Sequence, residues 1–282
     1  MPFLKNKQYI FCYNQVSFVI ACEMVKSNYQ QSQIIVMPNR VQKNNNIELE
    51  IVTYNPVSGL MILILSLFFK QIEVVIPHPK GGRISRWMAK YSRNLSYIDD
   101  GMDTFRDAPK NVELNLIREN TNYYSFDYDL PVAKWLDKLN VISVCSVNSL
   151  AKDVKPPANI EGFDGIVIES PGINMNSDYV NNGNFLFFRH PSYKKNQNVM
   201  DIRRTVSGLE YSLEKTLLKC QGKVIVGETM ALIFSLCCMP KEVPIHLYLS
   251  SVQYENLSCL HHLFSNHKNL IFEGFNDTDV KI

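Results

Sequence analysis

The sequence lacks three features, each of which would assign it to a well-marked class of protein. Its seven cysteines include no C-x-x-C pair, so neither a zinc site nor a disulfide framework is expected, and a reducing cytoplasm fits best. The net charge is only +2 and the basic residues are scattered, which gives no indication of a nucleic-acid partner. No apolar signal-peptide core follows Met1, so no secretory signal is expected.

The sequence also lacks an apolar run long enough to cross a bilayer. The longest run covers residues 59–69, well short of the roughly 20 residues that a membrane-spanning helix needs. Because this run is apolar on every side, it predicts a buried helix. Contact of the helix with a membrane surface, at the inner face of the cytoplasmic membrane, is the alternative.

What the sequence does contain is an alternation of strands and helices. In the first half, apolar and aromatic runs predict strands over residues 9–13, 34–37, 48–52, 72–76 and 95–98, and helices over residues 16–27, 58–70 and 83–90. Such alternation is typical of parallel βαβ units.

Alternation resumes after a loosely patterned stretch over residues 106–130. A proline pair, Pro156-Pro157, makes residues 152–161 the best linker candidate. The further strands are predicted over residues 141–145, 165–168, 184–188, 223–226 and 243–249, and the further helices over residues 133–139, 205–220, 229–238 and 253–264.

Two βαβ blocks on either side of a proline-containing linker predict an α/β protein with two facing Rossmann-like domains and a cleft between them. The predicted domains are residues 1–155 and residues 156–282. Glycosyltransferases of the GT-B type are built this way, and other two-domain α/β proteins also fit the pattern.

An acidic pair followed by glycine, Asp99-Asp100-Gly101, comes directly after the predicted strand 95–98. Adjacent carboxylates raise each other's pKa, and a glycine lets the backbone turn tightly and lets a ligand approach. Because open α/β sheets bind ligands at their strand ends, the pair suits a general base presented at a strand tip. A solvated turn is the alternative.

A histidine and a proline follow the aromatic strand 184–188, in Arg189-His190-Pro191. Proline fixes the turn, so the imidazole is expected at the carboxyl edge of the strand. There it can donate to a phosphate oxygen or supply a proton to a leaving group. A surface His-Pro turn is the alternative.

A third turn, Gly227-Glu228-Thr229, lies between a valine-rich strand and an apolar helix. The first amides of the helix and the threonine hydroxyl can bind an anion without a metal. Plain helix capping by Thr229 or Glu228 uses the same geometry and is the alternative. The carboxylate of Glu228 argues against a phosphate lying very close.

Two other patterns concern metals and histidines. Asp127-Tyr128-Asp129 matches the D-x-D pattern that holds a divalent cation in other sugar transferases, although so short a triplet is common by chance. His261, His262 and His267 are expected on the surface, and neighbouring histidines on a helix point to different faces. His78, between two prolines, has no predicted partner.

In their order along the chain, Asp99-Asp100-Gly101, His190-Pro191 and Thr229 resemble the motifs of bacterial sialyltransferases that make lipooligosaccharide caps and polysialic acid capsules. Those enzymes carry an acidic-acidic-Gly motif in the first domain, and a His-Pro motif and a Ser/Thr motif in the second. The resemblance implies a GT-B fold, CMP-sialic acid as donor, inversion at the anomeric carbon and no metal requirement.

The same resemblance implies roles for single residues. Asp100 would be the general base, His190 would bind and help neutralise the phosphate of the departing CMP, and Thr229 would hydrogen-bond that phosphate. Asp99 is expected to set the pKa and position of Asp100, and the alternative is that Asp99 itself is the base. The family often has Ser-Ser or Ser-Thr at the last motif, where this sequence has Glu228. The other expected substrate-binding residues are Asp99, Gly101, Pro191, Gly227, Glu228, Asn14 and Ser170.

The sequence therefore predicts a cytoplasmic sialyltransferase whose partners are a CMP-sugar donor and an oligosaccharide acceptor from a bacterial surface glycan. No cofactor, no metal and no nucleic acid are expected, and peripheral contact with the inner membrane is left open. The alternatives are a transferase for another CMP-activated ulosonic acid, such as Kdo or legionaminic acid, a metal-dependent transferase using Asp127 and Asp129, and a non-catalytic nucleotide- or glycan-binding protein.

Overall fold

The chain forms two compact α/β units, Met1–Ser149 and Leu150–Ile282, each built on a parallel sheet. The predicted α/β class is therefore confirmed. The computed structural model describes residues 7–27, 32–38, 50–77, 83–109, 113–152, 155–170, 173, 182–189 and 204–275.

The sheet of the first unit contains seven parallel strands. They are β1 (Lys7–Phe11), β2 (Ser32–Met37), β3 (Glu50–Thr53), β4 (Ile72–Pro77), β5 (Asn94–Ile98), β6 (Asn122–Asp127) and β7 (Asn140–Ser146). Their order is β3-β2-β1-β4-β5-β6-β7, so the direction of growth reverses between β1 and β4. Open α/β sheets bind ligands outside the carboxyl ends of their strands at such a switch point.

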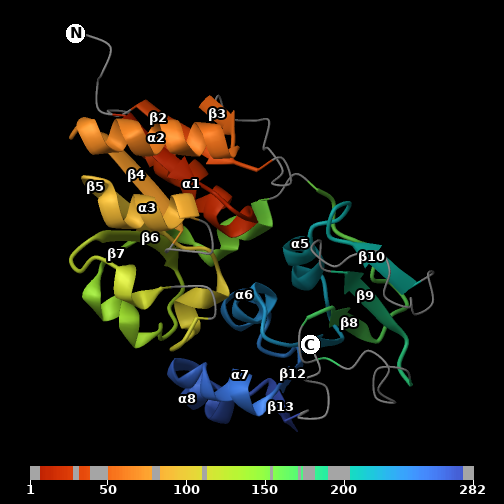
Figure 1. Cartoon of the computed structure of the whole chain (residues 1–282). Helices are drawn as coiled ribbons and strands as arrows, with labels where there is room; N and C mark the ends of the chain where they lie inside the picture. The colour runs from red at the N-terminus through yellow and green to blue at the C-terminus, as the bar shows by residue number, and fades with distance from the viewer. Residues whose placement is uncertain are drawn as a thin grey trace. The chain divides into compact units, whose positions relative to one another are not determined.

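Three α-helices pack on this sheet: α1 (Gln15–Ser27), α2 (Pro56–Phe68) and α3 (Arg83–Tyr91). Phe11 belongs to a core cluster that includes Leu63 of α2 and Met88 of α3. The next residue, Cys12, points to the other face, because side chains alternate along a strand, and its thiol contacts the main-chain oxygen of Ser17 in α1. Figure 1 shows α2 and α3 side by side over the sheet. The remaining helical segments are short 3₁₀ turns, η1 (Met102–Phe105), η2 (Leu114–Leu116), η3 (Lys134–Lys138) and η4 (Val147–Lys152).

The second unit repeats the strand order of the first. Its six parallel strands are β8 (Gly165–Ile168), β9 (Phe185–Arg189), β10 (Thr205–Ser207), β11 (Lys223–Val226), β12 (Ile245–Leu249) and β13 (Leu270–Phe275). Their order is β10-β9-β8-β11-β12-β13, so the switch point lies between β8 and β11. Each unit thus has the doubly wound order typical of a Rossmann-like domain.

The helices in the described part of the second unit are short, apart from α6. They are α5 (Leu213–Leu218), α6 (Met230–Cys238), α7 (Ser251–Glu255), η6 (Ser258–Leu260) and α8 (His261–Asn266). The proline pair, predicted as a linker, is tied into this unit instead. The main-chain oxygen of Pro156 accepts from the Ser212 amide at 2.9 Å, and the Ala158 amide donates to Oγ1 of Thr216 at 2.9 Å.

The prediction that the apolar run is buried is wrong for half of the helix it forms. Gly59, Ile62, Leu63 and Ser66 of α2 face the core. The opposite side of α2 is exposed and is also apolar. A run that is apolar on every side shows where a helix forms but not how much of it is covered.

Four segments of secondary structure also differ from the sequence prediction. Residues 205–220, predicted as one helix, form β10 and α5, and residues 253–264 form α7, η6 and α8. The strands β6 and β13 were not predicted, because the residues around β6 are rich in asparagine, tyrosine and aspartate. Pairing with β5 and β7 makes β6 a strand despite its weak pattern.

All seven cysteines are free thiols. Within the described residues, no helix has both the length and the apolar character needed to cross a membrane.

Candidate functional site

Asn14 and Asp100 meet at the carboxyl edge of the first sheet, although 86 positions separate them. Asn14 follows β1 and Asp100 follows β5, and β4 is the one strand between these two in the sheet. Nδ2 of Asn14 donates to the main-chain oxygen of Asp100 at 2.9 Å. Oδ1 of Asn14 also accepts from the Ser17 amide at 3.1 Å, which caps α1. Two predicted site residues are thus brought together beside the switch point.

Asp99 is fully buried, and three neighbouring groups hold its carboxylate. Oδ1 accepts from the Gly101 amide and from Oγ1 of Thr104, each at 2.7 Å. Oδ2 accepts from the hydroxyl of Tyr128. Thr104 also shares a hydrogen bond of 2.8 Å with the hydroxyl of Tyr123. Both carboxylate oxygens of Asp99 are therefore engaged in joining β5, η1 and the end of β6.

The surroundings of Asp99 make its carboxyl group less acidic than usual. Burial raises the pKa of Asp99 from 3.8 to about 6, and the negative charge of Asp100 adds to the rise. The hydrogen bonds from Tyr128, Gly101 and Thr104 lower the pKa, because they stabilise the ionised form. Burial outweighs them.

Asp100 is also buried, with 6% of its surface exposed, and its charge acts on residues that follow β1. Burial raises the pKa of Tyr13 to about 12, and the charge of Asp100 contributes to that rise. Burial likewise raises the pKa of the Cys12 thiol, again with a contribution from Asp100. Both neighbours therefore stay protonated and neutral at physiological pH.

Gly101 provides the tight turn that the sequence predicted. Its φ is 107° and its ψ is −126°, a conformation that side chains with a Cβ rarely adopt. This turn directs the Gly101 amide back to the carboxylate of Asp99. A residue other than glycine would therefore strain the turn that places Asp99 and Asp100.

Ser170 and Gly227 meet at the switch point of the second sheet. Ser170 follows β8, Gly227 follows β11, and these two strands are paired. The Gly227 amide donates to Oγ of Ser170 at 2.9 Å, and that hydroxyl donates to the main-chain oxygen of Ile168 at 3.1 Å. The Gly227 amide is thus used within the protein, and Ser170 fixes the loop that leads into α6.

Thr229 occupies the N-cap position of α6 but does not cap the helix. Its backbone is extended, with φ −141° and ψ 164°, and its side chain makes no capping hydrogen bond. Among the described residues, its buried Oγ1 has no hydrogen-bond partner. The capping alternative for Thr229 is therefore wrong. The hydroxyl lies beside helix amides that have no partner within the helix and that carry a partial positive charge.

Other polar residues lie around the same edge of the second sheet. Glu228 is buried, so the residue that departs from the sialyltransferase pattern does not simply extend into solvent. Arg189, the last residue of β9, lies 3.6 Å from Glu169, which precedes Ser170 (Nε to Oε2). The predicted His190 and Pro191 follow β9 but lie outside the described residues, as does His78.

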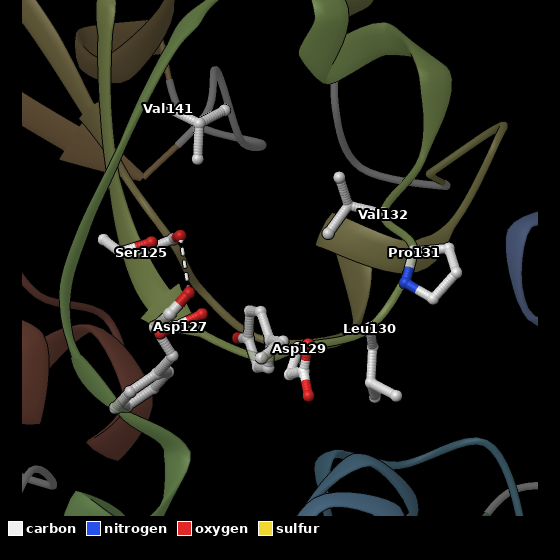
Figure 2. Close-up of a pocket in the computed structure, with 10 residues that line it drawn as sticks. Ser125, Asp127, Asp129, Leu130, Pro131, Val132 and Val141 are labelled. Carbon is white, nitrogen blue, oxygen red and sulfur yellow. Dashed lines mark hydrogen bonds between the residues drawn. The ribbon is translucent and has the colours of Figure 1, made fainter.

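The D-x-D triplet lines a pocket of about 390 Å³ between the carboxyl end of β6, the loop that follows it and the first half of β7 (Figure 2). Asp127 ends β6, and Asp129 has a positive φ of 51°. Tyr128 between them points inward to Asp99. In Figure 2 the side chains of Asp127 and Asp129 do not point toward one another. No group of three or more His, Cys, Asp or Glu residues in the described chain could hold a metal ion.

Of the three late histidines, His262 is exposed as predicted, whereas His261 and His267 are half-buried. The ring of His261 is stacked on Tyr254 at 4.1 Å and hydrogen-bonds to the main-chain oxygen of that residue at 2.7 Å. His262 is exposed and contacts Asn266 on the next turn. The side chains of His261 and His262 therefore lie on different sides of the helix.

The sequence did not single out Tyr128 or Thr104, which hold Asp99 in place. Thr104 lies five positions after Asp99 in the 3₁₀ turn η1, and a hydroxyl so close to an acidic pair is a weak local signal. Tyr128 is the middle residue of the D-x-D triplet, and that pattern is defined only by the two aspartates on either side of it. Its role depends on β6 lying next to β5, which the sequence did not predict.

In comparisons with known proteins, no family model matches the chain, and no curated protein is significantly similar to it. The resemblance to bacterial sialyltransferases therefore depends on three short motifs. Two of these motifs lie among the described residues.

Proposed function

We propose that this protein is an inverting, metal-independent sialyltransferase that transfers sialic acid from CMP-sialic acid to a hydroxyl of a bacterial surface glycan. One observation carries the proposal. In each unit, a predicted motif lies at the carboxyl edge of the sheet, next to or one strand from the switch point. Ligands of open α/β sheets bind at that place. The GT-B arrangement, with the two edges facing each other across a cleft, is part of the proposal.

Asp100 is the general base in this mechanism. Both oxygens of Asp99 accept hydrogen bonds from the protein, so Asp99 serves as a support and Asp100 takes the proton of the acceptor hydroxyl. The hydrogen bond from the Asn14 side chain to the main-chain oxygen of Asp100 fixes the backbone of Asp100. A positioned general base contributes about 10²–10⁴-fold to such a reaction.

Thr229 and the start of α6 bind the CMP phosphate. A buried hydroxyl at the N-cap that makes no capping bond is suited to donate to a phosphate oxygen, while the helix end favours the negative charge. His190 supplies the second contact and neutralises the phosphate as CMP departs. One phosphate stabilised by an imidazole, a hydroxyl and a helix end needs no metal ion.

The proposal is tested by incubating the purified protein with CMP-sialic acid and a panel of galactosides, with mass spectrometry of the products. We expect a product heavier by one sialyl residue. Asp100→Ala and His190→Ala should abolish transfer while the thermal unfolding curve stays close to that of the wild type. Normal turnover by both variants would exclude these roles.

Further measurements distinguish the proposed function from its alternatives. Transfer that survives excess EDTA is expected, whereas its loss would favour the metal-dependent transferase that uses Asp127 and Asp129. A donor panel that includes CMP-Kdo and CMP-legionaminic acid identifies the sugar. Binding of CMP in calorimetry without CMP release in any acceptor screen would contradict catalysis and favour a binding protein.

A further inference from the structure

The outward side of α2 is apolar along its whole length. Val57, Leu60, Met61, Ile64 and Phe68 recur at helical spacing and are all exposed, Val57 and Phe68 by 68% and 69%. The helix from Pro56 to Phe68 contains no charged residue. The outward face of a surface helix is normally polar or charged, so this stripe needs an apolar partner.

Helix α3 lies against α2, and both helices pack on the same side of the first sheet (Figure 1). Gly59 allows this close packing. A Cβ at that position would lie 3.2 Å from Cγ2 of Ile84 in α3 and 3.1 Å from the ring of Tyr54. The exposed sides of both helices therefore belong to the same face of the first unit.

The outward side of α3 carries cations and aromatic rings. Arg83, Arg86, Trp87, Lys90 and Tyr91 are exposed, and the ammonium of Lys90 lies 5.3 Å from the ring of Tyr91. Arg86 forms an ion pair with Glu113. We call the exposed residues of α2 and α3 together the α2–α3 face. It combines an apolar stripe with a neighbouring stripe of basic and aromatic side chains.

We propose that the α2–α3 face binds the surface of an anionic lipid bilayer. An apolar helix face buries its side chains at the boundary between headgroups and acyl chains. Trp and Tyr prefer the headgroup level, and Lys and Arg are attracted by anionic headgroups. This inference is independent of the proposed transferase activity, since it uses none of the residues assigned to catalysis.

Charge favours a bilayer over a second copy of the chain as the occupant. A symmetric dimer uses the same patch on both copies. The basic stripe of α3 would then lie either opposite the basic stripe of the partner copy, which like-charge repulsion opposes, or outside the interface in water. An anionic bilayer offers acyl chains to the apolar stripe and negatively charged headgroups to the basic stripe.

The test is co-sedimentation of the full chain with vesicles of phosphatidylcholine alone or of phosphatidylcholine and phosphatidylglycerol in equal parts. We expect binding to the anionic vesicles, weakened by added salt, and a blue shift of Trp fluorescence as Trp87 enters the interface. The double variant Met61→Glu/Phe68→Glu should bind at least about tenfold more weakly, because two apolar side chains no longer leave water. Arg83→Glu/Lys90→Glu should lose the preference for anionic vesicles.

Val252→Glu is the matched control, since Val252 is 65% exposed on α7 of the second unit. It should bind vesicles as the wild type does. Circular dichroism checks that each variant is folded, and the salt dependence of the wild type provides a readout without any substitution. Equal binding of the wild type to both kinds of vesicle, no binding to either, or dimers that Met61→Glu/Phe68→Glu converts to monomers would overturn the inference.

Discussion

The phenol of Tyr128 donates a hydrogen bond to Oδ2 of Asp99, although 29 positions separate the two residues. Together with the two donors to Oδ1, this contact gives the adjacent aspartates different tasks. Asp99 holds the strand end together, and Asp100 next to it is placed at the sheet edge. Replacing Asp99 should therefore affect mainly stability, and replacing Asp100 should affect mainly transfer.

Asp99 should make stability depend on pH. Its pKa is raised from 3.8 to about 6 by burial, so the folded state holds a proton that the unfolded state has released. The contribution of protonated Asp99 is fully present below pH 3.8 and is lost as the pH rises to about 6, by about 3 kcal/mol in total. Asp99→Asn should not show this loss.

Urea unfolding of the wild type and of Asp99→Asn at pH 4 and pH 7.5 measures the effect. The free energy of unfolding of the wild type, relative to the variant, should be higher at pH 4 than at pH 7.5. An equal difference at both pH values would show that the pKa of Asp99 is not raised.

Tyr128→Phe should raise the pKa of Asp99 further, because the hydrogen bond from Tyr128 lowers it. The pH range over which stability falls should move upward. At pH 7.5 the variant should lose about 1.5–3 kcal/mol, the net value of a hydrogen bond to a charged acceptor. Tyr124→Phe is the control, since Tyr124 on β6 interacts with Glu73 and Ser96 instead. If this pH range moved upward in both Tyr128→Phe and Tyr124→Phe, or in neither variant, the result would argue against a specific role for Tyr128.

Asn14→Ser should separate the two tasks of Asn14. Serine caps a helix about as well as asparagine, so the free energy of unfolding should fall only by about 0.5–1.5 kcal/mol, the net value of the lost hydrogen bond to the Asp100 oxygen. The shorter side chain cannot donate to the main-chain oxygen of Asp100, and transfer should fall about 10- to 100-fold because the base is less well placed. Asn14→Ala should lose about 1 kcal/mol in addition. Unchanged kcat in Asn14→Ser would contradict the positioning role.

Thr229→Val should leave stability unchanged or slightly higher, because the hydroxyl it removes makes no capping bond. The KM for the CMP-sugar should rise roughly tenfold or more, as expected for a lost hydrogen bond to a charged group. Ser212→Ala is the matched capping control, since Oγ of Ser212 accepts from the Lys215 amide at 3.3 Å. It should lose about 1 kcal/mol of stability with little effect on KM. A loss of stability in Thr229→Val with an unchanged KM for the CMP-sugar would show that Thr229 is a structural cap.

Asp129 should be required for its backbone conformation. Its φ is 51°, a region that costs an ordinary residue about 1–2 kcal/mol. Asp129→Ala should therefore lower the melting temperature, Asp129→Gly should retain it, and Asp127→Ala on the extended strand should change it little. A selective loss of EDTA-sensitive transfer in Asp127→Ala and Asp129→Ala would instead support a metal site at the D-x-D triplet.

Much of the architecture could be predicted from local pattern. The strands that lead into Asp99 and into Gly227 were predicted within one or two residues, and the tight turn at Gly101 has the positive φ expected of glycine. The strand β6 was not predicted, because its polar residues satisfy no simple alternation. Its neighbours in the sheet, β5 and β7, determine its conformation.

The sequence by itself determined where strands end and where acidic, hydroxyl and glycine residues follow them, because these features depend on neighbouring residues along the chain. Only the tertiary structure decided which aspartate is bound by Tyr128 and Thr104, that the Thr229 hydroxyl leaves its helix uncapped, and that one side of α2 is exposed. Each of these depends on which segments pack against one another, and side-chain contacts across a sheet are not encoded in any single stretch of residues.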